Sequence, residues 1–274
     1  MHLYDDLHHV IIMDDAGENT RTLKDIILAG SLSQRLAEDI GSACGAFLAN
    51  LHEIGSANNE ALEWAAGNKL AREILAWATY GRLVETVDGS DKSIPELQDP
   101  CLPLSPDQLD LLKKVAHLRQ EETMSNNETF IMGDFWPGNL LVSLSPDGQS
   151  LERIVVVDWE VCRAGMSGVD VGQFCGDLRV LLVHRIELKT TVNTLMEHFI
   201  NTYDNTRPNH DQIWAEKAAV ALGMHLAVWG PRIPYADSTK QKVRDMVTMG
   251  IDYITKYFGQ STNVKQYLSI SQVE

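Results

Sequence analysis

The chain has 274 residues, and its 23 lysines and arginines against 38 aspartates and glutamates give a formal net charge of −15 at pH 7. It has no run of lysine and arginine, which a nucleic-acid partner would require, so we expect none. Hydrophobic residues make up 44% and charged residues 22%, as in folded globular proteins rather than disordered ones.

No stretch approaches the ~20 apolar residues that span a bilayer, and the N-terminus lacks the basic-then-apolar order of a signal peptide. We therefore expect no membrane partner and a cytoplasmic location. The cysteines at 44, 101, 162 and 175 form no CxxC pair. This spacing favours free, mostly buried thiols over a zinc or redox site.

The first half of the chain has mainly helical periodicity. A strand-like run covers residues 9–13, and apolar residues three and four apart then predict a helix over 33–54 and one or two helices over 59–86. A loop rich in Pro, Ser and Asp spans 88–108, and a further helix is expected to run from Pro106 to about residue 124.

The middle of the chain changes character. Residues 129–132, 140–144 and 153–158 are short and rich in Ile, Val and Leu, and the turn sequence SPDGQS joins the last two. This pattern predicts a β-hairpin with a short strand before it. Helices are expected again over 169–184, 187–204, 209–229 and 238–258. The predicted fold is α+β and predominantly α-helical, with a central β-hairpin, in one domain of residues 1–274.

Three polar residues mark the predicted hairpin. Asp134 and Asn139 precede its first strand, and Asp158 ends its second, so the hairpin can bring all three to one end. Phosphoryl transfer requires a carboxylate for the proton of the attacking hydroxyl, and oxygen ligands that hold Mg²⁺ against the phosphates. The three residues together predict such a site.

The segment MGDFWPGNLLV resembles the catalytic loop, written HGDxxxxN, of the aminoglycoside phosphotransferase and choline kinase group. These are small-molecule kinases with a protein-kinase-like fold. VVVDWE is similar to the end of that family's metal-binding strand, and FLANLHEIG around His52 is similar to its helix ending in Leu-His. VIIMDDAG at 10–17 resembles its hinge strand, where adenine is held.

The resemblance implies a role for each matching residue. Asp134 would be the catalytic base, and Asn139 and Asp158 would be Mg²⁺ ligands. Glu160 would be a neighbouring polar contact. Asp170, in GMSGVDVGQF, would brace the catalytic loop.

The hinge-like segment implies a nucleotide contact at Met13, Asp14 and Asp15. Trp136, in the catalytic-loop segment, has two readings that the sequence leaves open. It stacks on a substrate, or it covers the loop.

The sequence departs from the family pattern in two places. Met132 stands where the family usually has His, and only nine residues precede Val10, so no lysine stands upstream of the hinge to pair with the phosphates of a nucleotide. The expectation is a kinase-like C-terminal lobe with residues 1–17 as a hinge-like remnant, which leaves ATP binding open. A second copy or a partner chain is expected to cover the hinge strand.

Three functions remain open on this basis. The first is Mg²⁺-dependent phosphoryl transfer to a small-molecule hydroxyl or amine. The second is a repurposed enzyme that eliminates or cyclises a Mg²⁺–diphosphate substrate, and the third is a non-catalytic, pseudokinase-like scaffold.

Aromatic residues late in the chain also have two interpretations. Trp214, Leu222, His225 and Trp229 lie at helical spacing and either fill the core or line a substrate pocket. The loop 228–237 is a candidate pocket wall, with Arg232 able to meet an anionic group.

Overall fold

The computed structural model describes residues 2–207 and 213–260, and it opens with a two-stranded hairpin. β1 (Leu3–Asp5) pairs antiparallel with β2 (Val10–Ile12), with Tyr4 opposite Ile11. The expected strand at 9–13 is therefore present, with a partner strand that the sequence did not reveal. Val10, Ile11 and Ile12 are 41–54% exposed. Coverage of this strand by another chain stays a prediction.

The predicted central hairpin is confirmed, and a third strand joins it. β5 (Leu140–Leu144) pairs antiparallel with β6 (Leu151–Val156), and β3 (Thr20–Thr22) pairs with the other edge of β5. β6 ends two residues earlier than expected, so Asp158 lies in the turn beyond it. The strand expected at 129–132 is β4 (Thr129–Ile131), which pairs with β7 (Arg163–Gly165) in a separate sheet.

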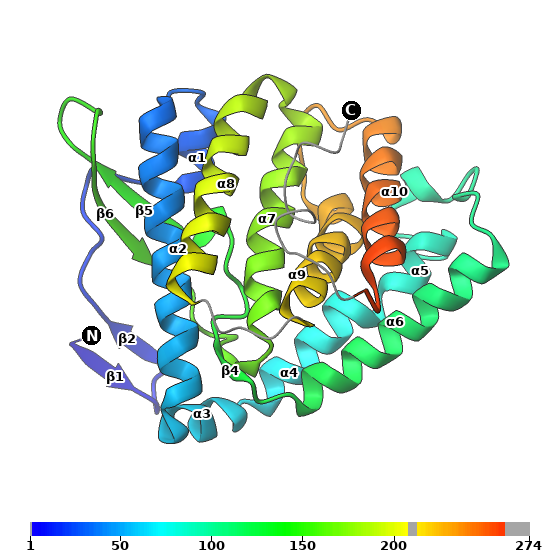
Figure 1. The fold of residues 1–274 in the computed structure, drawn as a ribbon, viewed down its shortest axis with the longest axis horizontal. Helices are drawn as coiled ribbons and strands as arrows, with labels where there is room; N and C mark the ends of the chain where they lie inside the picture. Colours follow the sequence, from blue (N-terminus) through cyan, green and yellow to red (C-terminus); the bar gives the residue numbers. More distant parts are fainter. Residues whose placement is uncertain (1, 208–212, 261–274) are drawn as a thin grey trace.

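Long helices pack side by side, and the β1–β2 and β5–β6 hairpins lie at one edge of the molecule, beside α2 (Gln34–Ala57) (Figure 1). The short α1 (Leu23–Leu28) leads to α2, which packs along α8 (Lys189–Thr206). The two helices lie very close, because a Cβ at Gly45 would come 2.3 Å from the carbonyl oxygen of Phe199. A short 3₁₀ turn, η4 (Ile186–Leu188), precedes α8.

On the other side, α7 (Ser167–His184) packs against α9 (Ile213–Met224), and α10 (Lys240–Tyr257) covers α9. Glycine again permits the contact between α7 and α9. A Cβ at Gly172 would come 2.3 Å from the carbonyl oxygen of Ala218. This close approach fixes the relative position of two helices that contribute to the site below.

The segment expected as one or two helices over 59–86 contains four. They are α3 (Asn59–Ala66), α4 (Lys69–Leu75), a π-helical turn η1 (Ala76–Gly81) and α5 (Leu83–Asp88). The starts of α3 and α4 have a local cause, because the side chains of Asn58 and Asn68 cap these helices by accepting from the backbone N–H groups of Ala61 and Ala71.

After the 3₁₀ turn η2 (Pro95–Leu97), α6 (Pro106–Ser125) begins with the capping box of Ser105 and Gln108. The helix expected over 209–229 is α9 followed by a second π-helical turn, η5 (His225–Trp229), and the 3₁₀ turn η6 (Gly230–Arg232). Its expected first residues lie outside the described part of the chain. π-helical turns are rare and occur often at functional sites.

Two sequence expectations concern the chain as a whole. Within the described ranges, no helix is both long and apolar enough to cross a membrane. The four cysteines are free, and Cys44, Cys162 and Cys175 are buried, as the sequence predicted.

Candidate active site

A cavity of about 380 Å³ lies between the segment 133–136, α7 and the two π-helical turns. Most of its wall is apolar or aromatic, with Tyr80, Trp136 and Trp229 as the large rings. Its polar lining comprises Thr79, Asp134, Glu160, Arg163, Gln173, Asp177 and His225. Volume and lining are those of a small-molecule site, which is typically apolar with a few placed polar groups.

Asp134 is half-buried in the cavity wall, and both of its carboxylate oxygens accept hydrogen bonds. Gln173 Nε2 donates to Oδ1 at 2.6 Å, and Asn139 Nδ2 donates to Oδ2 at 3.0 Å. Burial raises the pKa of Asp134 above its ordinary value, while the hydrogen bonds from Gln173 and Asn139 act to lower it. These two bonds fix the orientation of the carboxylate in the cavity wall.

Asp170 on α7 anchors the backbone before Asp134 through hydrogen bonds. The backbone N–H groups of Met132 and Gly133 each donate to a different oxygen of this fully buried carboxylate, at 2.8 Å. His52 adds a third donor, since its Nε2 lies 3.2 Å from Asp170 Oδ2 and a carboxylate only accepts. The loop keeps its anchor with Met132 in place of a histidine, because Met132 contributes its backbone rather than its side chain.

His52 is placed for this contact by α2, which continues five residues beyond it. The His52 side chain is fully buried, and its Nδ1 is hydrogen-bonded to the Tyr203 hydroxyl at 2.8 Å. His52 therefore lies inside the helix and braces the loop. It is not a helix-terminal residue as the Leu-His resemblance implied.

Asn139 and Asp158 are brought together along the backbone. The N–H of Val157, the residue before Asp158, donates to the carbonyl of Asn139 at 3.0 Å. Asp158 is exposed and adopts a left-handed backbone, with φ of 67°, which non-glycine residues rarely adopt. Neither side chain forms part of the cavity wall that Asp134 lines.

The donor set around Asn139 and Asp158 fits Mg²⁺. Because the Asn139 amide nitrogen is committed to Asp134, its amide oxygen and the Asp158 carboxylate are the atoms available to a cation, and both are hard oxygen donors. The described residues contain no group of three or more His, Cys, Asp or Glu side chains placed to hold a metal. Mg²⁺ is commonly held by one or two protein ligands together with substrate phosphates, so this small set suffices.

Trp136 and Glu160 both line the cavity. Lys24 makes a cation–π contact with Trp136, with its Nζ 5.1 Å from the ring centroid. The Trp136 ring also packs over Gly138, because a Cβ at Gly138 would come 2.3 Å from the nearest ring atom. Trp136 thus presents an aromatic wall to whatever the cavity binds. Glu160 is exposed in the turn beyond β6.

Met13, Asp14 and Asp15 lie elsewhere, at the end of the N-terminal hairpin. Met13 is 62% exposed, and Asp14 pairs with His2 at 2.7 Å, also at the surface. Asp15 accepts from the backbone N–H of Gly17. None of the three lines the cavity that contains Asp134, and their assignment to a nucleotide stays a prediction.

The structure adds polar lining residues that the sequence did not single out. Gln173 and Asp177 lie one turn apart on α7, and Arg163 comes from β7. The undecided pair His225 and Trp229 lines the cavity, whereas Trp214 and Leu222 are buried in the core. Only tertiary packing, of α7 against η5 and of η5 against η1, distinguishes these positions from ordinary core residues.

The loop 228–237 contributes Trp229 and Ile233 to the cavity wall, as expected. Arg232 does not line the cavity. Its guanidinium pairs with the carboxylate of Asp91 and donates to the hydroxyl of Thr86 at 2.9 Å. The anionic group that it meets therefore belongs to this chain's own 88–108 loop.

Two curated proteins resemble this chain over most of its length. A 4-hydroxytryptamine kinase from Psilocybe cyanescens is 29% identical over 252 residues, which cover 91% of this chain and 63% of that protein. A 4-hydroxytryptamine kinase from Psilocybe cubensis is 28% identical over 230 residues, which cover 82% and 58%. The chain thus spans about three fifths of the length of these relatives.

A family model for the phosphotransferase enzyme family, APH, matches residues 11–194. The match contains the hairpin, the Asp134 loop, Asp158 and all of α7, and it agrees with the α+β, mainly helical, kinase-like fold expected from the sequence. This chain therefore belongs to the phosphotransferase enzyme family.

Proposed function

We propose that this protein transfers a phosphoryl group to the hydroxyl of a small aromatic molecule that binds in the cavity. The observation that carries the proposal is the placement of Asp134. Its carboxylate lies in the wall of an aromatic cavity, and Gln173 and Asn139 fix both of its oxygens.

Asp134 would orient the acceptor hydroxyl and accept its proton as the phosphoryl group is transferred. Positioning is the main contribution of a protein to this reaction, because its transition state is loose and needs little covalent help. The raised pKa of Asp134 makes the carboxylate a better proton acceptor than an ordinary aspartate. Asp170 would act indirectly, because its carboxylate accepts hydrogen bonds from the backbone that precedes Asp134.

Mg²⁺ and ATP are the cofactors we propose, since kinases of this type generally use both. Asn139 and Asp158 would hold the metal through their oxygens. When bound, Mg²⁺ supplies neutralisation of the charge on the phosphates. Met13, Asp14 and Asp15 remain proposed nucleotide contacts, and the cytoplasm is the proposed location.

The acceptor class follows from the cavity and from the named activity of the relatives. Tyr80, Trp136 and Trp229 give the cavity three aromatic walls, and about 380 Å³ accommodates a molecule the size of a substituted indole. Both relatives carry the name 4-hydroxytryptamine kinase. We therefore propose a hydroxylated aromatic amine such as 4-hydroxytryptamine as the acceptor.

The direct test is incubation of the 274-residue chain with ATP, Mg²⁺ and 4-hydroxytryptamine, followed by mass spectrometry of the small molecules. The expected product has gained one phosphoryl group, and Asp134→Asn should form it far more slowly. Equal turnover by Asp134→Asn would contradict the assigned role.

Calorimetric titration with ATP and with inorganic diphosphate, each with and without Mg²⁺, separates this proposal from the two alternatives. Metal-dependent ATP binding that Asp158→Asn abolishes would support phosphoryl transfer. Binding of diphosphate without ATP would favour the repurposed enzyme. The absence of detectable binding in all of the titrations would favour a non-catalytic scaffold.

A further inference from the structure

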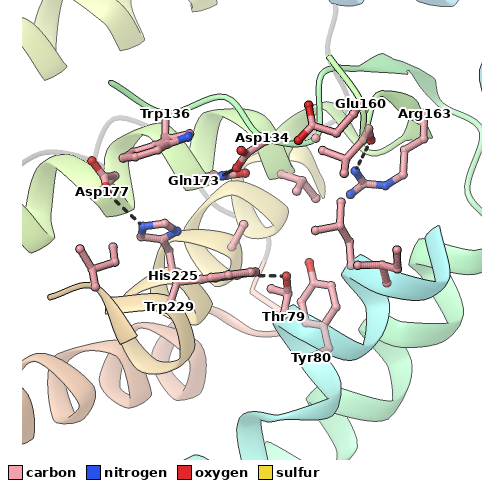
Figure 2. Close-up of a pocket in the computed structure, with 17 residues that line it drawn as sticks. Thr79, Tyr80, Asp134, Trp136, Glu160, Arg163, Gln173, Asp177, His225 and Trp229 are labelled. Atoms are coloured by element: carbon pink, nitrogen blue, oxygen red, sulfur yellow. Dashed lines mark hydrogen bonds and ion pairs between the residues drawn. The ribbon is translucent and has the colours of Figure 1, made fainter. Parts of the chain in front are cut away.

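The cavity has a second polar end, formed by Asp177 on α7 and His225 at the start of η5. Both residues line the cavity, and His225 Nε2 lies 3.5 Å from Asp177 Oδ1. Figure 2 shows the two side chains together at one side of the cavity, with Asp134 and Gln173 farther along. Nothing in the proposed phosphoryl transfer uses this pair.

Asp177 is unusual because its charge is buried without hydrogen bonds. The residue is 0% exposed, and among the described residues neither carboxylate oxygen has a hydrogen-bond partner. The facing His225 Nε2 and the nearby Tyr235 hydroxyl are buried and lack hydrogen-bond partners in the same part of the chain. A buried carboxylate without hydrogen bonds costs free energy, so its retention at a cavity wall indicates that a ligand completes it.

Packing holds this pair in place and leaves it little freedom to find partners within the protein. A Cβ at Gly176 would come 2.6 Å from His225 Cβ, so α7 and η5 approach closely at this point. The ring of Tyr235 stacks on His184 with centroids 4.0 Å apart. Rigid, incompletely paired polar groups at a cavity wall form a preorganised binding site.

The charge of the cavity favours a cation. Three carboxylates, from Asp134, Glu160 and Asp177, face one arginine and one histidine across its lining, and the whole chain carries a net charge of −15. An ammonium group that enters the cavity meets Asp177 in an environment of lower dielectric constant than bulk water. The attraction between the two opposite charges is stronger there than in water. The aromatic rings around it also favour cations.

The spacing along α7 places the two polar ends of the cavity about one helical turn apart. Gln173, which donates to Asp134, and Asp177 are four residues apart in one helix, so their Cβ atoms are separated by roughly 5–6 Å. Because Asp134 and Asp177 line one cavity of about 380 Å³, a single small ligand can reach both carboxylates.

We propose that Asp177, with His225 beside it, is the subsite that binds the cationic amine of the acceptor while Asp134 meets its hydroxyl. The inference rests on the proposed function for the choice of acceptor. It assigns the protein to hydroxylated arylalkylamines rather than neutral phenols or alcohols.

The test measures binding without any phosphoryl donor, so it is independent of catalysis. The probes are tryptamine, which has the ammonium group and no acceptor hydroxyl on its ring, and 3-(2-hydroxyethyl)indole, in which a hydroxyl replaces the ammonium. Calorimetry on the wild-type chain should give tryptamine at least a tenfold tighter dissociation constant. Asp177→Asn should weaken tryptamine binding about 10- to 100-fold and leave the neutral probe unchanged.

Two further variants complete the design. Asp177→Glu keeps the charge and should retain a preference for tryptamine, and Asp252→Asn, at an exposed position on α10, should behave like the wild type. Asp177→Asn should melt at the same or a higher temperature, because it removes an unsatisfied buried charge.

The inference is overturned if the wild type does not prefer tryptamine, or if Asp177→Asn binds it as tightly as the wild type. A lower melting temperature with unchanged tryptamine binding would assign the pair to the stability of the fold. Failure of the proposed function gives a different pattern, in which tryptamine binding depends on Asp177 but 4-hydroxytryptamine is not phosphorylated.

Discussion

The two polar ends of the cavity differ in how completely their polar atoms are paired. At the Asp134 end, Gln173 and Asn139 donate to the carboxylate, and Asp170 below it accepts from Met132 and Gly133. At the other end, Asp177 is buried with neither oxygen hydrogen-bonded within the described chain. The two carboxylates therefore line the same cavity, but among the described residues only that of Asp134 accepts hydrogen bonds from neighbouring side chains.

This difference matches two kinds of work. A group that orients a hydroxyl for reaction must already be in position, which the donors to Asp134 ensure. A group that selects a ligand by charge binds it more tightly if the group has no hydrogen bonds in the free protein. Ligand binding then offsets the free energy that burial of the group costs. The contrast predicts that changes at the two ends will separate catalysis from binding.

The largest expected effect comes from Asp134→Asn. Loss of a proton-accepting carboxylate should reduce the turnover of 4-hydroxytryptamine by about 10²- to 10⁴-fold. Tryptamine binding should change little, because the Asp177 end is intact. Steady-state kinetics and calorimetry on one preparation provide both measurements, and an equal loss of both would erase the proposed division between the two ends.

Asp170→Asn should disturb the Asp134 end through its backbone. An asparagine side chain has one acceptor oxygen for donors that now use two, so a buried N–H loses its partner at a cost of about 1–3 kcal/mol. The free energy of unfolding from urea denaturation should fall by that amount, and kcat should fall more than KM rises. Unchanged kcat in a folded variant would remove Asp170 from its positioning role.

Gly176→Ala tests the opposite end. The added methyl meets His225 Cβ at 2.6 Å, so we expect a loss of about 1–3 kcal/mol in stability and weaker tryptamine binding as η5 shifts. Gly81→Ala is the control, because the atom nearest to its added methyl, Cδ1 of Trp77, lies farther away, at 3.2 Å. Similar losses of stability and binding in the two variants would mean that close packing at His225 has no special role.

The smallest effect is a shift in pH dependence. Gln173→Leu removes a hydrogen bond that lowers the pKa of Asp134, so that pKa should rise further. The role proposed for Asp134 requires its ionised carboxylate, so the acid limb of the kcat profile should move to higher pH while the plateau above it is retained. Gln241→Leu, at an exposed position on α10, should leave the limb in place.

The sequence predicted the Asp134 end far better than the Asp177 end. Asp134, Asn139 and Asp158 stand at element boundaries next to a turn signal, where polar residues between apolar strands are conspicuous. Asp177 lies within a helix whose residues are nearly all buried, so no amphipathic pattern indicates which face meets a cavity. His225 and Trp229 could not be assigned for the same reason.

The elements that the sequence did not predict are short or depend on distant partners. β3 and β7 have three residues each, too few for a periodic pattern, and each pairs with a strand more than 30 residues away. The π-helical turns η1 and η5 contact each other, and Trp229 Nε1 donates to Thr79 Oγ1 across that contact at 3.2 Å. No local sequence rule anticipates such an arrangement.

The most direct test of this account is a side-by-side measurement of kcat and KM for 4-hydroxytryptamine phosphorylation by the wild type, Asp134→Asn and Asp177→Asn. The account predicts that Asp134→Asn loses kcat with little change in KM, whereas Asp177→Asn raises KM and keeps most of kcat. Loss of kcat in both variants with KM unchanged, or wild-type kinetics in either, would contradict it.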